Sequence, residues 1–224
     1  MDLAALPGGD QDILGAFEEG LLDCLRSAER VVLVANNPAI GQADVDALSL
    51  GPRDAVVSFN TCLKWPLLSS LSANIFIHGC NAPDQYFFGL PYGPGVQALW
   101  QAPEARCFTI LVGVAHPMSP VKGVSLFRER IPLPALWNYP SAHANGKRFV
   151  GPSTGFNALV LFDWLRCDQG MDFRLLTLGY SNDGGKLWSG HAWDYERAWL
   201  ANADVETMAL QRRPSWWQRL LKRR

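Results

Sequence analysis

The sequence predicts an α/β protein: a single Rossmann-like domain with a mostly parallel sheet and helices on both faces. Three observations indicate this fold class. Short apolar runs recur along the chain, stretches with helical patterning separate several of them, and polar residues follow directly where several runs end. Strands that are apolar on both faces are typical of parallel sheets covered by helices. The length of 224 residues suffices for one domain with a substantial core.

Five apolar runs are predicted to be strands. They occupy residues 30–35, 55–59, 74–79, 107–113 and 173–180. Branched and aromatic apolar residues dominate these runs, as expected for strands buried on both faces. Residues 79–106, rich in Gly, Pro and aromatic residues, are predicted to be irregular. In residues 116–149 Pro recurs too often for long regular elements, and this segment is predicted to pass over one face of the domain.

Three further segments are predicted to be helices. The first has apolar residues at helical spacing, namely Ile13, Leu14, Phe17, Leu21, Leu22 and Leu25. The second spans residues 153–166 and follows a turn rich in Gly and Pro. The third begins near His191 and is expected to run past Ala209.

The turn before the second helix is a candidate anion site. It reads Gly151-Pro152-Ser153-Thr154-Gly155, and Ser153 and Thr154 are both suited to cap the helix that follows. The first N–H groups of a helix have no acceptor within it, and the helix dipole favours negative charge there. A plain N-cap without a ligand is the alternative interpretation.

Polar residues follow three of the predicted strands. Asn36 and Asn37 come after the first strand, Asn60 after the second, and Gly179 and Tyr180 close the last. Ligands of open α/β sheets bind beyond the carboxyl ends of the strands. Asparagine at a strand end can also be only a turn former. The succession of such residues nevertheless favours a crevice lined with amide donors.

His191 and Glu196 lie near the start of the third predicted helix. The ordinary pKa of histidine, about 6.5, suits proton abstraction near neutrality. Glu196 is placed to stabilise a helix N-terminus or to orient the histidine. A purely structural histidine is the alternative.

The charge distribution argues against a nucleic-acid binder. The chain carries 20 basic and 21 acidic residues, and six of the basic ones fall within residues 210–224, where no acidic residue occurs. The remaining residues therefore carry 14 basic against 21 acidic side chains. We accordingly expect an α/β domain at residues 1–209, a separate basic and aromatic tail at 210–224, and no nucleic-acid partner.

Cysteine usage and hydropathy point to a cytoplasmic protein. The five cysteines are scattered, odd in number and form no Cys-x-x-Cys pair, which argues against a zinc site or a disulfide framework. The N-terminus lacks the pattern of a signal peptide, and no run approaches the roughly 18 apolar residues of a membrane-spanning helix.

The tail has the composition of an interfacial helix. The tryptophans and leucines of residues 214–224 share one helical face and are flanked by cations, as in helices that lie on anionic lipid. A disordered tail, or one docked on the acidic body of the protein, is the alternative. Peripheral attachment to the inner face of the membrane is therefore a second expectation for localisation.

With these pieces assembled, the chain resembles sialyltransferases of the eukaryotic type (glycosyltransferase family 29) and their bacterial relatives. The large sialylmotif is similar to residues 31–38 continued through 55–60. The short motif is similar to residues 152–155 with the following helix and the strand ending at 178–180. The very short motif, a histidine followed by a glutamate, is similar to His191 and Glu196. The three motifs occur in the family's order across residues 30–196.

The resemblance implies a GT-A-like variant of the Rossmann fold and an inverting, metal-independent transfer. A sialic acid or related sugar acid would move from a CMP-sugar donor to a glycan or glycolipid acceptor. The catalytic residues would be His191, as general base, and Glu196. The donor-binding residues would be Asn36, Asn37, Asn60, Ser153, Thr154, Gly155, Gly179 and Tyr180. The donor is a substrate, so no resident cofactor is implied.

Several residues depart from the family pattern. Ala35 precedes Asn36 where the family has glycine, and Ser58 stands where arginine is common. The disulfide between the large and short motifs has no obvious counterpart, and a His-Tyr motif between Tyr180 and His191 is absent. These departures leave the donor sugar and the acceptor open.

Two other functions remain open at this point. A hydrolase could use Ser153 as nucleophile and His191 as base, although the Gly-x-Ser-x-Gly elbow is missing. A non-catalytic nucleotide or glycan binder would keep the crevice without turnover.

Overall fold

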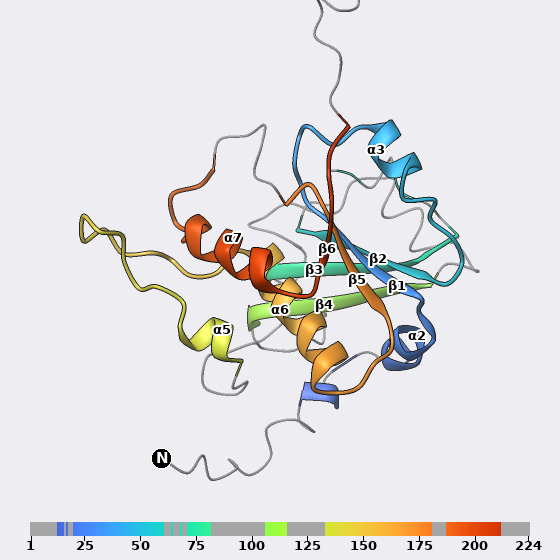
Figure 1. Ribbon diagram of the computed structural model, residues 1–224. Coiled ribbons are helices and arrows are strands. Elements are labelled where there is room, and N and C mark those ends of the chain that lie inside the picture. The colour runs from blue at the N-terminus through green and yellow to red at the C-terminus, as the bar shows by residue number, and fades with distance from the viewer. Residues whose placement is uncertain are drawn as a thin grey trace, which may run out of the picture.

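A six-stranded, all-parallel sheet forms the centre of the protein (Figure 1). The computed structural model describes residues 13–15, 17, 20–60, 64, 68, 71–81, 106–115, 133–180 and 187–211. The strands are β1 (Arg30–Val34), β2 (Asp54–Phe59), β3 (Ala73–Asn81), β4 (Cys107–Ala115), β5 (Arg174–Leu178) and β6 (Glu206–Met208). The helices are α2 (Leu21–Ser27), α3 (Gln42–Asp46), α5 (Pro134–Trp137), α6 (Thr154–Cys167) and α7 (Trp193–Asn202).

The strand order is β4-β3-β2-β1-β5-β6, so the sheet grows in two directions from β1. In the register, Val31 lies beside Ala55 of β2 and Leu175 of β5. Strands β2 to β4 extend the sheet on one side of β1, and β5 and β6 extend it on the other. The order therefore reverses between β1 and β5, which is where open α/β sheets place their ligand crevice, at the carboxyl ends of the strands.

Side chains of alternate strand residues form two separate cores. Val31 and Leu33 of β1 belong to a large cluster that includes residues of α2 and α6, whereas Val32 and Val34 belong to a smaller cluster with Val45 of α3. Successive strand residues point to opposite faces, so the two clusters lie on opposite sides of the sheet. Both faces are thus covered, which explains why β1 is apolar without alternation.

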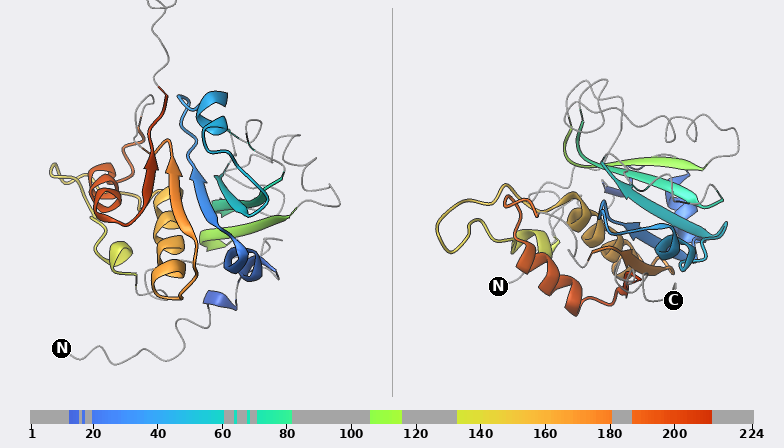
Figure 2. Two further views of the ribbon diagram at one scale, coloured as in Figure 1. Left: turned by 45° about the vertical axis from the view of Figure 1, so that its right-hand side comes forward. Right: turned by 90° about the horizontal axis from the view of Figure 1, so that it is seen from above.

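Helix α7 lies beside α6 in all views (Figures 1 and 2). The rings of Phe156 in α6 and Trp199 in α7 meet edge to face, with centroids 5.5 Å apart. This packing brings the residues just before α7 next to the N-terminus of α6. Both segments contain site residues that the sequence predicts, namely His191 before α7 and Ser153 at the start of α6.

The fold class and all five predicted strands are confirmed, with ends shifted by a few residues. The predicted helix at 153–166 is α6, with Ser153 as its N-cap. In the segment predicted to lack long regular elements, residues 133–149 hold the four-residue helix α5 and one isolated bridge between Ala142 and Arg148. The rest of this segment and residues 79–106 lie mainly outside the described residues.

Two predicted helices are wrong in extent. Gly20 adopts a left-handed conformation with φ of 78°, so α2 begins only at Leu21, although Ile13 and Leu21 share one core. Helix α7 ends at Asn202 instead of running past Ala209. Ala203 is extended, and residues 206–208 then pair with β5 as strand β6. The local sequence pattern does not show that residues 206–208 have β5 as a pairing partner.

Candidate active site

The N-terminus of α6 is built by its cap. Ser153 is extended, with φ of −65° and ψ of 154°, and its Oγ accepts a hydrogen bond of 3.0 Å from the N–H of Phe156. The carbonyl of Ser153 accepts from the N–H of Asn157 at 2.9 Å. The N–H groups of Thr154 and Gly155 precede these bonded positions and have no acceptor within the helix. They are the donors that an anion at this helix end would meet.

Glu196 belongs to α7 but satisfies the N-terminus of α6. Its side chain is buried and accepts three hydrogen bonds: from Ser153 N–H at 2.9 Å, from Ser153 Oγ at 2.7 Å and from the Tyr139 hydroxyl at 2.8 Å. Three donors and the positive end of a helix compensate for burial of a carboxylate. The hydroxyl proton of Ser153 points to Glu196, so Thr154, not Ser153, has the hydroxyl available for a ligand.

His191 is oriented by a backbone carbonyl and not by Glu196. Its Nδ1 lies 2.7 Å from the carbonyl oxygen of Gly151. A carbonyl only accepts, so this bond requires the proton on Nδ1 and leaves Nε2 of the neutral ring as a proton acceptor. The rings of Trp188 and Trp193 meet the imidazole edge to face, with centroids at 4.6 and 5.2 Å.

Asn60 joins the ends of two strands to α6. Its backbone is left-handed, with φ of 51°. Its Oδ1 accepts from the N–H of Gly79 at 3.2 Å, and its Nδ2 donates to Oγ1 of Thr154 at 3.3 Å. A Cβ at Gly79 would lie 2.7 Å from Oγ1 of Thr154, so only glycine permits this approach. Residues from β2, β3 and α6 therefore meet at the carboxyl edge of the sheet.

Asn36 and Asn37 brace the loop after β1. Nδ2 of Asn36 donates to the carbonyl of Phe59 at 2.8 Å, and Nδ2 of the buried Asn37 donates to the carbonyl of Gly179 at 2.9 Å. Oδ1 of Asn37 accepts from the N–H of Ala39. The amide of Asn37 is thus engaged within the protein at both ends, which gives it a bracing role between β1 and β5.

Gly179 and Tyr180 follow β5 and contact the loop after β1 and the first turn of α6 respectively. Gly179 has φ of 80°, and a Cβ there would lie 2.5 Å from Cδ1 of Ile40. The Tyr180 hydroxyl donates to the carbonyl of Gly155 at 3.1 Å. Burial, followed by the nearby charge of Glu196, raises the pKa of Tyr180 well above its ordinary value, so the phenol stays protonated.

The structure thus brings all ten predicted site residues into one region, eight through contacts or chain adjacency with one another and two through an intervening residue. Glu196, Ser153, Thr154, Gly155, Tyr180 and Asn60 are linked by direct or shared contacts, and Asn37 and Gly179 form a neighbouring pair. His191 joins this region through Gly151, and Asn36 joins it through Phe59. Tyr139 was not singled out in the sequence, because it lies in a segment predicted to be irregular and has no motif around it.

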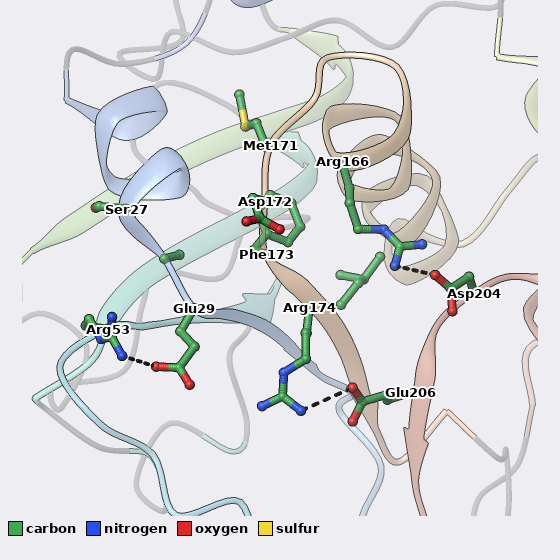
Figure 3. A pocket seen from close by; sticks show the side chains of 12 residues that line it. Ser27, Glu29, Arg53, Arg166, Met171, Asp172, Phe173, Arg174, Asp204 and Glu206 are labelled. Atoms are coloured by element: carbon green, nitrogen blue, oxygen red, sulfur yellow. Dashed lines mark hydrogen bonds and ion pairs between the residues drawn. The ribbon is translucent and has the colours of Figure 1, made fainter.

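A hollow lies at the opposite, amino end of the strands (Figure 3). It has a volume of about 660 Å³ and is lined by residues at the starts of β1, β2 and β5. Its three arginines each pair with a carboxylate: Arg53 with Glu29, Arg166 with Asp204, and Arg174 with Glu206. Because these cations are already paired and no predicted site residue reaches this end, we do not assign a ligand to it.

Comparison with known proteins identifies no relative: no family model, no curated protein and no solved structure matches the chain. Within the described residues, no helix is long and apolar enough to cross a bilayer. The described part of the chain also contains no group of three or more metal-binding side chains. The predicted tail helix at 214–224 lies outside the described residues.

Proposed function

We propose that this protein is a glycosyltransferase that moves a sialic acid or related sugar acid from a CMP-sugar to a glycan or glycolipid acceptor. The observation that carries the proposal is the bond between Nδ1 of His191 and the carbonyl of Gly151. It fixes the tautomer in which Nε2 accepts a proton. A general base needs this arrangement, and here it lies beside the N-terminus of α6.

The donor site of this proposal is the carboxyl edge between β1, β2 and α6. The N–H groups of Thr154 and Gly155 and the hydroxyl of Thr154 would bind the phosphate of the CMP group. Asn60 holds Thr154 in place through its Nδ2. Uncharged donors at a helix N-terminus stabilise a phosphate dianion or its transition state without a bound cation, which is why the proposal is metal-independent.

In the proposed reaction, a hydroxyl oxygen of the acceptor attacks the anomeric carbon of the donor sugar. The bond between that carbon and the phosphate oxygen breaks, and CMP leaves with the electron pair. Nε2 of His191 takes the proton of the attacking hydroxyl. Attack from the face opposite the leaving group inverts the configuration, and the α6 N-terminus stabilises the charge that develops on CMP.

The acceptor would approach beside Trp188. This tryptophan is 55% exposed although it contacts the His191 ring. Val150 is 75% exposed. The N–H of Val150 donates to the carbonyl of Gly190, which places both apolar side chains near His191. A pyranose ring has one apolar face, and an exposed aromatic surface next to the base suits such a ring.

The geometry does not favour a serine hydrolase. Ser153 donates its hydroxyl proton to Glu196, and the Nδ1 of His191 bonds to Gly151. A hydrolase would need the serine hydroxyl to donate to the histidine. A non-catalytic binder of nucleotides or glycans remains the alternative, and turnover separates the two.

The test is CMP release from a panel of CMP-sugars, measured with and without candidate acceptors and with EDTA. We expect release with at least one sugar acid, stimulated by acceptor and unaffected by EDTA. CMP should also raise the melting temperature more than UDP or GDP does. Absence of release with every CMP-sugar, together with stabilisation by CMP, would indicate the binder. Loss of binding in EDTA, or equal stabilisation by UDP and GDP, would contradict the donor assignment.

Cytoplasmic location with attachment to the inner face of the membrane is part of the same proposal. It depends on residues 214–224, whose cations and apolar side chains are segregated in the sequence. Deletion after Arg213 should abolish binding to anionic vesicles while the melting temperature stays constant. Unchanged vesicle binding would show that the tail is not the anchor.

A further inference from the structure

A single phenol hydroxyl connects the segment after α5 to both halves of the candidate active site. Tyr139 is 5% exposed, and its oxygen accepts the N–H of Ala192 at 2.7 Å and donates to Oε1 of Glu196 at 2.8 Å. These directions are fixed, because a backbone N–H only donates and a carboxylate only accepts. Ala192 directly follows His191, and Glu196 holds Ser153 at the N-terminus of α6.

His191 is therefore bracketed by one segment of the chain. On its carboxyl side, Tyr139 accepts the N–H of Ala192. On its amino side, the N–H of Val150 donates to the carbonyl of Gly190 at 2.8 Å. The residues before and after His191 are thus both bound to residues 133–150, and the ring is bound to Gly151, which follows the same segment.

We propose that Tyr139 is a positioning residue that holds the backbone of His191 in register with the N-terminus of α6. The inference rests on the proposed role of His191 as general base. Tyr139 does not reach the reacting atoms. It acts through Ala192 on the base and through Glu196 on Ser153, so that the proton acceptor and the phosphate-binding helix end keep a fixed separation.

The surroundings of Tyr139 suit a rigid support. Its ring packs edge to face on Tyr195 at 5.3 Å and on Phe149 at 6.5 Å, measured between centroids. Burial, followed by the charge of Glu196, raises the pKa of Tyr139 far above its ordinary value. The hydroxyl therefore remains a donor to Glu196 at every pH at which the enzyme would work.

The chain offers a matched control in Tyr195. This tyrosine packs on the same aromatic cluster, and its hydroxyl donates to the carbonyl of Ala135 in α5 at 2.7 Å. Tyr139→Phe and Tyr195→Phe therefore each delete one hydroxyl and one hydrogen bond with a backbone group, that of Ala192 before α7 and that of Ala135 in α5 respectively. Only Tyr139→Phe also removes a bond to Glu196 and leaves the N–H of Ala192 without this acceptor.

The first test compares transfer kinetics of the two variants with those of the parent enzyme. We expect Tyr139→Phe to lower kcat by roughly tenfold to a hundredfold, the range for a small misplacement of a catalytic group. The KM for the CMP-sugar and the stabilisation by CMP should change less than about twofold, since the phosphate donors stay on α6. Tyr195→Phe should keep the parental kcat. Equal kcat values for the two variants would overturn the proposal.

The second test does not require turnover. Nitrogen-15 NMR of the histidine rings, with the His191 signals assigned by His191→Gln, reports which ring nitrogen carries the proton. The parent and Tyr195→Phe should show His191 protonated on Nδ1 at neutral pH, and Tyr139→Phe should show a mixture of tautomers. If no CMP-sugar is turned over by the parent, the proposed function fails and this comparison alone decides the positioning role. An unchanged tautomer in Tyr139→Phe would then overturn it.

Discussion

The two ends of the sheet use their polar groups differently. At the amino end, charged side chains pair with one another: Arg30 with Asp54, Arg53 with Glu29, and Arg174 with Glu206. At the carboxyl end, uncharged donors and one buried glutamate form a hydrogen-bonded network. Among the described residues, this network provides no donor for Nε2 of His191 and no acceptor for the N–H groups of Thr154 and Gly155.

This difference separates stability from function. A charge that is paired inside the protein stabilises the fold but has little left to offer a ligand. A donor that burial and helix geometry leave unpaired is available for recognition. At the amino end, the ion pairs around the hollow therefore stabilise the fold. The carboxyl end is the candidate active site. Four substitutions can break or sharpen this contrast.

The largest expected effect is that of His191→Ala. Loss of the proposed general base should reduce the transfer rate by roughly two to four orders of magnitude. The affinity for CMP should stay close to that of the parent, because in the proposed site the nucleotide contacts α6 and the loops after β1 and β2 and not His191. Steady-state kinetics and calorimetric titration with CMP measure the two quantities. Arg174→Ala at the amino end is the control and should leave the rate intact.

A His191→Ala variant that folds normally and transfers sugar at the parental rate would rule out His191 as the base. The carboxyl end would then be a binding site alone. A large rate loss in Arg174→Ala would show that the contrast between the two ends is wrong.

The next effect is that of Glu196→Gln. A carboxamide offers one acceptor oxygen where Glu196 meets three donors, so at least one bond from Ser153 or Tyr139 is lost. Hydrogen bonds to buried charged groups contribute about 2 kcal/mol, and we expect the free energy of unfolding to fall by that amount. Urea unfolding measures it. Glu206→Gln, whose partner Arg174 is half exposed, should be close to neutral.

If both glutamine variants unfold at the same urea concentration as the parent, the bonds of Glu196 do not hold α7 to the N-terminus of α6. The transfer rate of Glu196→Gln should fall as well, because Ser153 and Tyr139 lose their common partner.

A smaller effect is expected from the ion pair between Arg30 and Asp54. Burial by itself would raise the pKa of Asp54, but the hydrogen bonds from Arg30 and from the N–H of Gly51 outweigh it and lower the pKa. The folded state thus binds the proton more weakly than the unfolded state. The stabilisation is present above the ordinary pKa of about 3.8 and is lost as the pH falls through the lower, folded-state value.

Asp54→Asn should therefore lower the free energy of unfolding by about 1–2 kcal/mol at pH 7 and flatten its decline in acid. Urea titrations between pH 2.5 and 7 (roughly the range over which an aspartate titrates) test this. CMP affinity at pH 7 should not change. An acid limb identical to that of the parent would contradict the assignment of this pair as a stabilising element.

The smallest effect is that of Thr154→Ala. Removing the hydroxyl that we propose to bind the phosphate should weaken CMP binding by about 1 kcal/mol, or roughly fivefold. The matched control is Thr207→Ala in β6, whose Oγ1 lies 3.3 Å from that of Thr177 in β5. Equal CMP affinities for the two variants would remove Thr154 from the donor site.

Much of the fold follows from local sequence. The apolar runs that became β1 to β5 can be recognised because most residues of a strand covered on both faces are apolar. The cap of α6 can be predicted from the sequence because Ser153 and the residue whose N–H it accepts, Phe156, are only three positions apart. The same locality places His191 and Glu196 near a helix start, although the sequence does not show what they contact.

What the sequence by itself determined is therefore the set of elements, the capped helix and the polar strand ends. Tertiary structure alone decided the rest. Strand β6 formed because β5 had a free edge, and Glu196 bonded Ser153, 43 positions earlier, instead of His191. The tautomer of His191 and the bridging role of Tyr139 depend on atoms from segments far apart in sequence. A hydrogen bond is specified by the positions of two atoms, and those positions are set by packing, which no local pattern encodes.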